Sequence, residues 1–218
     1  MKKIQLLFLF VLIMTTNSFT QTRETKEIKS FLQKGQFSLG MRTSTSFFGH
    51  DKIPAMGVGG QMRLQILNFI NTEWFADWTT IDLKGAGTRS NAHIGWSVMF
   101  YPRQTGKIIP YALAGHCFDY AKVRPLSTPY LDRSSDMVSR WSSAIQIGLG
   151  SHFFISDRFD VSLSAQYMLH LGDHLNYELI ETNTTYYLET NTSLHEGPDI
   201  EGHLLITASM NFVIGDLW

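Results

Sequence analysis

The stretch VSLSAQYMLHL, residues 161–171, alternates two kinds of side chain along its whole length. One set is apolar, and the residues between are mostly small or polar; the apolar set is Val161, Leu163, Ala165, Tyr167, Leu169 and Leu171. Because successive side chains of a β-strand point to opposite faces, this pattern predicts a strand with one apolar and one polar face. Soluble strands usually have about 5 to 6 residues, whereas a tilted membrane-crossing strand needs about 9 to 11. The stretch is therefore long enough to cross a membrane.

The same pattern returns from residue 35 to the C-terminus. We predict eight such strands, over residues 35–47, 55–67, 72–83, 90–101, 108–120, 140–154, 161–171 and 200–214. No apolar segment in this region has the roughly 20 residues of a spanning helix, and strands cross lipid only as a closed barrel, in which every backbone polar group is paired. The prediction is an all-β fold, an eight-stranded antiparallel up-and-down transmembrane β-barrel. A soluble sandwich and a lipocalin-like barrel with its apolar face inward are the alternatives.

The first twenty residues have the features of a secretory signal. Lys2 and Lys3 precede an apolar run over residues 4–14, and small or polar residues then lead to a cleavage position before Gln21. We therefore divide the chain into a signal peptide at 1–20, a short periplasmic leader at 21–34 and an outer-membrane β-barrel at 35–218.

The composition excludes some partners and one source of stability. The chain has 18 basic and 19 acidic residues, so no excess of positive charge points to nucleic acid. Cys117 is the only cysteine, and no internal disulfide can form. We expect a monomer that is stabilised by strand pairing and by contact with outer-membrane lipid.

The predicted connections differ in length between the two ends of the barrel. Three are short, at residues 68–71, 102–107 and 155–158, and two are long and polar, at residues 121–139 and 172–199. Outer-membrane barrels have short periplasmic turns and longer extracellular loops, so we expect both termini to be periplasmic. The long loops contain Tyr130, Tyr177, Tyr186 and Tyr187 and could bind an extracellular ligand, although polar loops without a ligand are equally expected. Residues 186–188 could add a hairpin to the barrel.

Aromatic residues fall near the ends of the predicted strands, as in the girdles that mark the two water boundaries of a membrane barrel. Those near the short turns are Trp74, Phe100, Phe153 and Phe212. Those nearer the long loops are Trp78, Trp96, Trp141 and Tyr167.

The segments NTEWFADW (71–78), HIGWSVMFYP (93–102) and SDRFDVSLSAQYMLHLG (156–172), with a last strand that ends in aromatics, resemble the outer membrane protein beta-barrel domain family. This family contains small OmpA/OmpX-like eight-stranded barrels of the Bacteroidota type. The resemblance covers residues 35–218 and implies a fold and a bacterial outer-membrane location, but no activity. It also implies recognition by the barrel assembly machinery. The last strand continues past Phe212, so either Phe212 or Trp218 could be the assembly signal.

Four charged residues fall on the polar faces of three adjacent predicted strands: Arg42, Arg63, Glu73 and Asp77. The interior of an eight-stranded barrel is about filled by side chains, and an unpaired interior charge costs several kcal/mol. We therefore predict an ion-pair cluster in a packed polar lumen, and counting from the turn at 68–71 places Arg63 near the height of Asp77. The cluster could be purely structural, or it could be a gate for a narrow water path.

Four histidines are also predicted to face the lumen: His93, His116, His170 and His203. His93 and His116 lie equally far from the turn at 102–107, which would make them neighbours, although the alternation over 108–120 is the least regular in the chain. Imidazoles bind metals and sense pH. Because no HxxxH motif and no cysteine cluster accompanies them, we predict hydrogen-bonded lumen residues, no metal site and no cofactor.

These observations favour a small outer-membrane barrel with a structural or surface-interaction role and no catalytic centre. A narrow porin-like channel is the first alternative. A barrel that hydrolyses or transfers acyl chains of lipid A is the second, but no Ser, His and acid set falls at neighbouring positions in the sequence pattern.

Overall fold

The structure is a computed structural model that describes residues 31–48, 53–126, 137–173, 175, 177–181, 186–190 and 198–218. The predicted signal peptide and residues 21–30 of the leader lie outside these ranges. Within them, no helix is long and apolar enough to cross a membrane.

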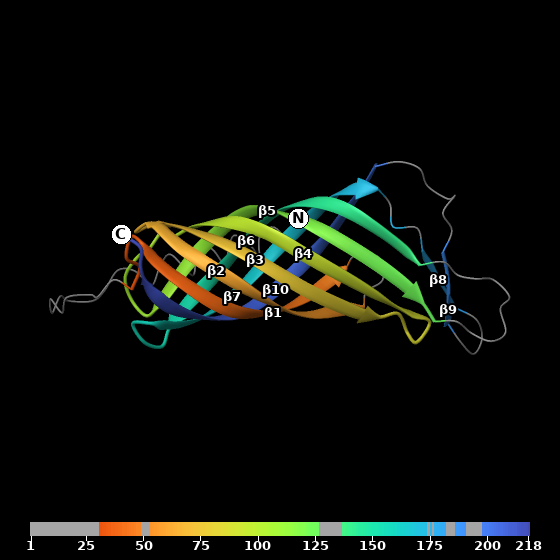
Figure 1. Cartoon of the computed structure of the whole chain (residues 1–218), viewed down its shortest axis with the longest axis horizontal. Coiled ribbons are helices and arrows are strands. Elements are labelled where there is room, and N and C mark those ends of the chain that lie inside the picture. Colours follow the sequence, from red (N-terminus) through yellow and green to blue (C-terminus); the bar gives the residue numbers. More distant parts are fainter. Residues whose placement is uncertain are drawn as a thin grey trace, which may run out of the picture.

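Eight long strands close into one antiparallel barrel, in the order β1-β10-β7-β6-β5-β4-β3-β2 (Figure 1). They are β1 (Gln36–Phe48), β2 (Pro54–Leu67), β3 (Ile70–Asp82), β4 (Gly87–Phe100), β5 (Ile108–Pro125), β6 (Val138–Phe154), β7 (Phe159–Asp173) and β10 (Pro198–Asp216). From β1 to β7 each strand pairs with the next along the chain, β10 pairs with β7, and β10 also pairs with β1 to complete the circle. The predicted barrel is confirmed, and the sandwich alternative is wrong.

The strands are staggered, as barrel closure requires. Stepping from each residue to its Cα partner on the next strand, a path that leaves β1 at Ser38 comes back to β1 at Phe48. A stagger of this kind tilts barrel strands by about 35 to 45° from the axis. The tilt is visible in Figure 1.

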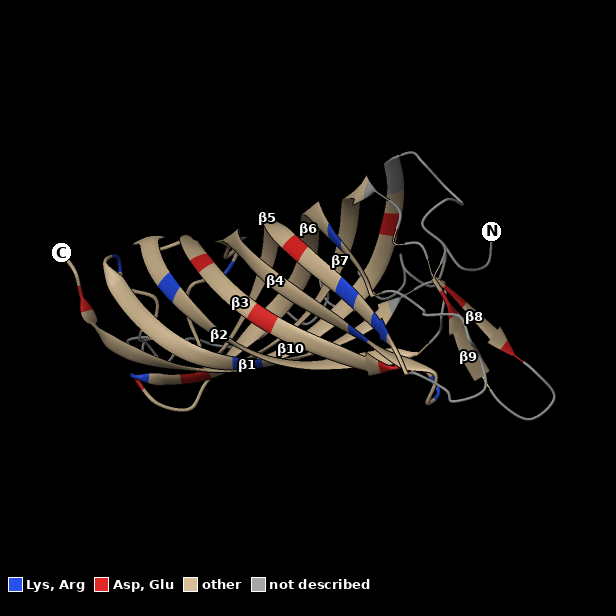
Figure 2. Cartoon of the chain, turned by 45° about the vertical axis from the view of Figure 1, so that its right-hand side comes forward, with Lys and Arg blue, Asp and Glu red and all other residues tan. Residues whose placement is uncertain are grey.

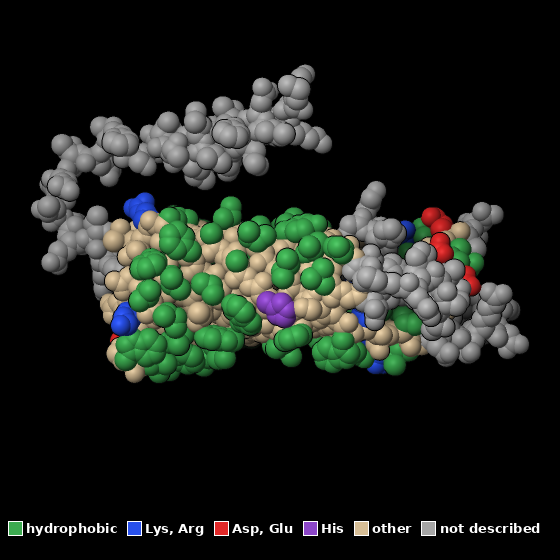
Figure 3. All heavy atoms as spheres, turned by 90° about the horizontal axis from the view of Figure 1, so that it is seen from above, with side chains coloured by type: hydrophobic (Ala, Val, Ile, Leu, Met, Phe, Trp, Pro, Cys, Tyr) green, Lys and Arg blue, Asp and Glu red, His purple; other side chains and the backbone are tan. Residues whose placement is uncertain are grey.

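The barrel wall is apolar outside and polar inside. Met41 and Leu149 are 73% and 70% exposed, whereas Arg63 and Glu73 are only 3% and 4% exposed. Hydrophobic side chains are spread along the whole length of the barrel wall on the face seen in Figure 3. A soluble protein has the opposite arrangement, because apolar side chains are stable in water only when they are buried. The lipocalin-like alternative, with the apolar face inward, is therefore wrong.

The two ends of the barrel differ, and we name them by their connections. At the turn end, β2–β3, β4–β5 and β6–β7 are joined by residues 68–69, 101–107 and 155–158. The N-terminal and C-terminal segments meet at this end, where the Leu217 amide donates a hydrogen bond to the Gly35 carbonyl (2.9 Å). The loop end is the opposite end, where β3 ends and β4 begins and where β5 ends and β6 begins.

The two long loops are shorter than the sequence predicts. β5 continues to Pro125 and β6 begins at Val138, so residues 121–125 and 138–139 are strand and not loop. Polar and charged residues near these strand ends hid the extension, because the wall continues past its apolar part. Within 172–199, β8 (Glu178–Glu181) and β9 (Tyr186–Glu189) form a separate two-stranded sheet and do not extend the barrel wall.

Candidate functional site

The chemistry of this protein is concentrated inside the barrel, where polar side chains from all eight strands converge. Figure 2 marks the charged positions along these strands. The interior is arranged in polar and apolar levels from the turn end to the loop end.

Arg63 is the centre of an ion network nearer the turn end. Its Nε lies 2.7 Å from Glu73 Oε2, and its Nη1 lies 3.2 Å from Asp160 Oδ1. Arg42 extends the network, because its Nη1 is 3.2 Å from Glu73 Oε1 and its Nε is 3.1 Å from Asp77 Oδ1. All five side chains are at least nine-tenths buried. Each charge therefore has a partner of opposite sign, which a low-dielectric interior requires.

The network includes the four residues expected from the sequence, but two of its contacts differ. Arg63 does not lie at the height of Asp77: its Cα partner on β3 is Glu73, because the β2–β3 turn is tighter than the sequence suggested. Asp77 instead pairs with Arg42. Asp160 was missed because it precedes the predicted strand by one residue. Extending the alternation of residues 162, 164 and 166 back by one step would have placed it inside.

Gly59 makes the contact between Arg42 and Asp77 possible. It is the Cα partner of Arg42 on one side and of Asp77 on the other, so it lies between them. A Cβ atom built on Gly59 would overlap the Asp77 carboxylate and the Ala76 carbonyl oxygen. The absence of a side chain here leaves the space through which the two charged groups meet.

We expect Gly59→Ala to lower the free energy of unfolding by about 1 to 3 kcal/mol, the usual range for overpacking. The adjacent Gly60 provides the matched control, because a Cβ there would have the Gly40 carbonyl oxygen, 3.8 Å away, as its nearest neighbour. Urea unfolding of both variants in lipid vesicles measures the difference. Equal stabilities for Gly59→Ala and Gly60→Ala would contradict the role assigned to Gly59.

An apolar plug lies at the turn end, on the side formed by β4, β5 and β6. It consists of Leu32, Met99, Tyr101, Ile109, Tyr111, Leu113 and Phe154. Phe31 of the leader stacks on Phe154 with ring centroids 4.8 Å apart, so the leader is part of the plug. The cavity between the plug and Arg63 has a volume of about 20 Å³, which is room for about one water molecule.

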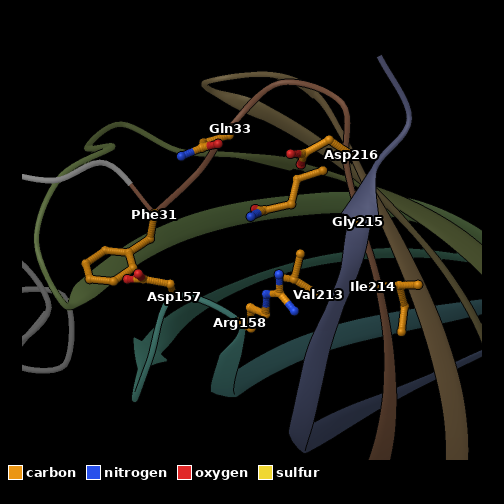
Figure 4. A pocket seen from close by; sticks show the side chains of 9 residues that line it. Phe31, Gln33, Asp157, Arg158, Val213, Ile214, Gly215 and Asp216 are labelled. Atoms are coloured by element: carbon orange, nitrogen blue, oxygen red, sulfur yellow. The ribbon is translucent and has the colours of Figure 1, made fainter.

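A second pocket lies beside the plug at the turn end (Figure 4). Its lining comes from the leader, the start of β1, the β6–β7 turn and the end of β10: Phe31, Gln33, Gln36, Asp157, Arg158, Val213, Ile214, Gly215 and Asp216. Since Phe31 contacts the plug and also lines this pocket, the pocket borders the plug.

Above the ion network, an apolar middle layer crosses the lumen. Its members come from five strands and are all less than 5% exposed: Phe75, Cys117, Ala144, Met168 and Leu205. The Arg42 guanidinium lies 4.4 Å from the centroid of the Phe75 ring, so the ion network contacts this layer directly.

Three of the four predicted lumen histidines meet directly above the middle layer. His93, His170 and His203 are 1–2% exposed, and Asp119 of β5 joins them. His93 Nε2 lies 3.0 Å from Asp119 Oδ1, and His170 Nδ1 lies 3.3 Å from Asp119 Oδ2. His170 Nε2 is 3.1 Å from His203 Nδ1, and these two rings stack. Asp119 was not singled out from the sequence because the facing of its strand was assigned wrongly.

His116 is the fourth predicted lumen histidine, and it lies outside the barrel. Its Cα partner is Trp96, which faces outward, whereas the partner of His93 is Asp119. The Cα partner of His93 lies three residues later along β5 than equal spacing from the predicted turn implies. Because strand faces alternate, an odd offset moves every side chain to the other face. The prediction for His116 was wrong for this reason.

A different histidine, His152 of β6, faces the lumen at the turn end. Its Nδ1 lies 3.1 Å from Asp160 Oδ1, and its Nε2 is 3.0 Å from the Tyr101 hydroxyl. It therefore joins the ion network to the plug. His152 follows the same alternation as the inward-facing Gln146, but its partners depend on the register between strands.

At the loop end, a third polar level lies under an apolar cap. Arg89 and Arg140 both pair with Glu201. Above them, Leu175 and Leu188 pack on inward-facing residues of the wall; the whole cap is Ala55, Ile81, Leu83, Ala86, Ala121, Val123, Leu175 and Leu188. Leu175 and the β9 residue Leu188 are thereby anchored on the wall at this end.

The eight predicted girdle residues all lie on the outer face, with exposed fractions from 37% for Trp74 to 70% for Trp141. Phe100, Phe153 and Phe212 lie near the turn end of their strands. Trp96 is not nearer the loops, as the sequence suggested, because its Cα partner is Trp74. These two tryptophans lie side by side on the outer wall, at similar heights. The other girdle residues are Trp78, Trp141 and Tyr167.

The outer face also carries one hydrogen-bonded His and Ser pair. His116 Nε2 lies 2.6 Å from Ser143 Oγ, and the other contact of the imidazole is the ring of Phe118. Neither contact is a carboxylate, so within the described residues this pair lacks the acid that orients the base in a hydrolytic triad.

Several solved structures resemble this chain. Neisserial surface protein A matches with a TM-score of 0.51 and 11% identity, over 82% of this chain and 97% of that chain. Outer membrane protein OprG from Pseudomonas aeruginosa matches with a TM-score of 0.51 and 10% identity, over 84% of this chain and 97% of that chain. A major outer membrane protein from Thermus thermophilus matches with a TM-score of 0.51 and 8% identity, over 82% of this chain and 99% of that chain. The predicted resemblance to small outer-membrane barrels is confirmed at the level of the fold. No protein-family model and no curated protein sequence matches the chain.

Proposed function

We propose that this protein is an integral protein of a bacterial outer membrane, with both termini in the periplasm and the long loops outside the cell. Its apolar outer wall and its polar interior support this location, because lipid is the solvent that suits such a wall. The short connections at the turn end support the orientation. The partners that follow are outer-membrane lipid and the barrel assembly machinery, for which Phe212 and Trp218 are the candidate signals. A monomer is expected.

Its role is structural or a surface interaction, and its lumen does not conduct. The observation that carries this proposal is that three apolar assemblies occupy the lumen: the turn-end plug, the middle layer and the loop-end cap. Ions and polar solutes cross only where they keep their hydration shell or where polar groups of the protein replace it. The residues of the middle layer offer no such path, and they are fixed on five strands of the wall.

We expect the refolded mature protein to give no steady open level in single-channel recordings. The same vesicles must contain folded barrels, which heat-modifiability on a gel verifies through the faster migration of the unheated protein. A stable conductance step in most insertions would favour the narrow porin-like channel instead. In that case the network of Arg42, Arg63, Glu73 and Asp77 would be the candidate gate.

The surface-interaction part of the role rests on the loop end. The segments 121–139 and 172–199 contain two of the connections at this end, where Tyr186 and Tyr187 of β9 are partly exposed. Tyr177 precedes β8 and accepts a hydrogen bond from Arg89. Tyrosine and asparagine are common at adaptable binding surfaces. Tyr130 lies outside the described residues. An extracellular ligand that binds these loops would be lost when residues 178–189 are replaced by a short Gly-Ser linker in a barrel that still folds.

An enzymatic role has weaker support. An acyl hydrolase or transferase acting on lipid A would need a nucleophile, a base and usually an orienting acid within contact distance. The His116 and Ser143 pair provides two of the three. Lipid A from cells with and without the protein would show a change in acylation if the pair were catalytic, and we expect none.

A further inference from the structure

The strongest chemical feature outside the ion network is the level formed by His93, Asp119, His170 and His203. Each residue comes from a different strand: β4, β5, β7 and β10. His93 and Asp119 are direct Cα partners, so their side chains enter the lumen together. β6 lies between His170 and Asp119. The Cα partner of His170 on β6 is the buried Ala144, whose small side chain leaves room for His170 to contact Asp119.

The spacing of these groups suits one metal ion. Ligand atoms of His93, Asp119 and His170 all lie within 4.8 Å of one another. Zinc binds imidazole nitrogen at about 2.0–2.1 Å and carboxylate oxygen at about 2.0–2.2 Å, so two ligands of one ion lie at most about 4.2 Å apart. The three donors therefore need to move only slightly closer together to share one ion.

The polar atoms of this level are poorly satisfied by one another. His93 is 1% exposed, yet neither of its ring nitrogens makes a hydrogen bond with good geometry, and the same is true of Asp119 Oδ1. Buried polar atoms without partners cost about 1 to 3 kcal/mol each. A bound cation would satisfy His93 and Asp119 at once, whereas a network of hydrogen bonds would need the rings to turn.

The surroundings fit a metal centre as well. The Ser142 hydroxyl donates a hydrogen bond to Asp119 Oδ2 (3.4 Å), and an outer hydrogen bond to a ligating carboxylate fixes its orientation. His203 stacks on His170 with ring centroids 4.8 Å apart and is the candidate for a fourth donor. Several imidazoles with one carboxylate suit zinc and similar transition metals, whereas calcium and magnesium prefer oxygen donors.

We propose that His93, Asp119 and His170, with His203 as the fourth donor, bind a single divalent transition-metal ion of the zinc type inside the barrel. The ion ties together four strands that do not all neighbour one another. The middle layer lies below the site and the apolar cap lies above it, so the ion enters while the barrel folds. No metal-binding motif is visible in the sequence because the four donors are far apart along the chain.

The test is to refold the full mature chain in detergent with Zn²⁺, remove free metal by desalting, and measure retained zinc by mass spectrometry. We expect about one zinc per folded barrel. His93→Gln and Asp119→Asn should each retain at least about ten-fold less. His116→Gln, outside the barrel, and His152→Gln, at the turn end, are matched controls that should retain as much zinc as the wild type.

Folding is checked separately by heat-modifiability, so a variant that does not fold is set aside and His170→Gln takes its place. Refolding with Co²⁺ gives an independent readout, since a site with nitrogen and oxygen donors in tetrahedral geometry produces visible absorption bands. A folded wild-type barrel that retains no metal overturns the proposal. So does equal retention by the wild type and by folded His93→Gln and Asp119→Asn. Neither result depends on whether the lumen conducts.

Discussion

Replacing Arg63 with methionine is expected to lower the free energy of unfolding by about 3 to 5 kcal/mol. Arg63 neutralises both Glu73 and Asp160, and it also donates hydrogen bonds to the hydroxyls of Ser162 and Ser209. Methionine is similar in length but leaves the two carboxylates with less positive charge in a dry interior. Removing one partner of a buried ion pair destabilises a protein more than replacing both partners with apolar residues, because it leaves an unpaired charge in the interior.

Urea titration of the protein in lipid vesicles measures this effect. Arg124→Met is the matched control, because Arg124 is exposed near the loop end of β5 and its loss should change stability by less than about 1 kcal/mol. The double variant Arg63→Met with Glu73→Gln should lose less than the sum of the two single variants, since the residues are in contact. A loss below about 1 kcal/mol for Arg63→Met would mean that the network contributes no more than a surface ion pair.

The direction of the side chains could be predicted from the sequence because it depends on alternation alone. Ile145, Ile147 and Leu149 lie outside and Gln146 lies inside, as the pattern of β6 implied. The inward direction of Arg42, Arg63, Glu73 and Asp77 followed from the same rule. A period of two is robust, because a shift by two residues leaves the face unchanged.

The partners of each side chain could not be predicted, because they depend on the register between strands. A turn of unknown length leaves the register uncertain by several residues. That error placed Arg63 beside Asp77, when its partner is Glu73, and it placed His116 inside the barrel. It also separated Trp96 from Trp74. The middle layer and the two apolar ends were missed for another reason: inward-facing apolar residues such as Phe75 and Leu113 interrupt the alternation and look like noise in a single strand.

Replacing Ile147 with arginine is expected to lower the free energy of unfolding by about 2 to 4 kcal/mol when the barrel is in a bilayer. Ile147 lies near the middle of β6, its side chain is 66% exposed, and its Cα partners are Ala114 and Tyr167. In water, arginine at such an exposed position would change stability by about 0.5 kcal/mol or less. The predicted loss therefore arises from lipid, which cannot solvate a charge at that depth.

Ser139→Arg is the matched control for this prediction, because Ser139 is exposed on the same strand but near the loop end, where the expected loss is about 0 to 1 kcal/mol. The depth dependence is measured by unfolding both variants from vesicles and comparing each with the wild type. Equal losses at the two positions, or an Ile147→Arg protein that stays monomeric and folded without detergent, would show that water surrounds this wall. Either result would remove the basis for placing the protein in a membrane, because it is the solvent around residues such as Ile147 that decides what the barrel can do.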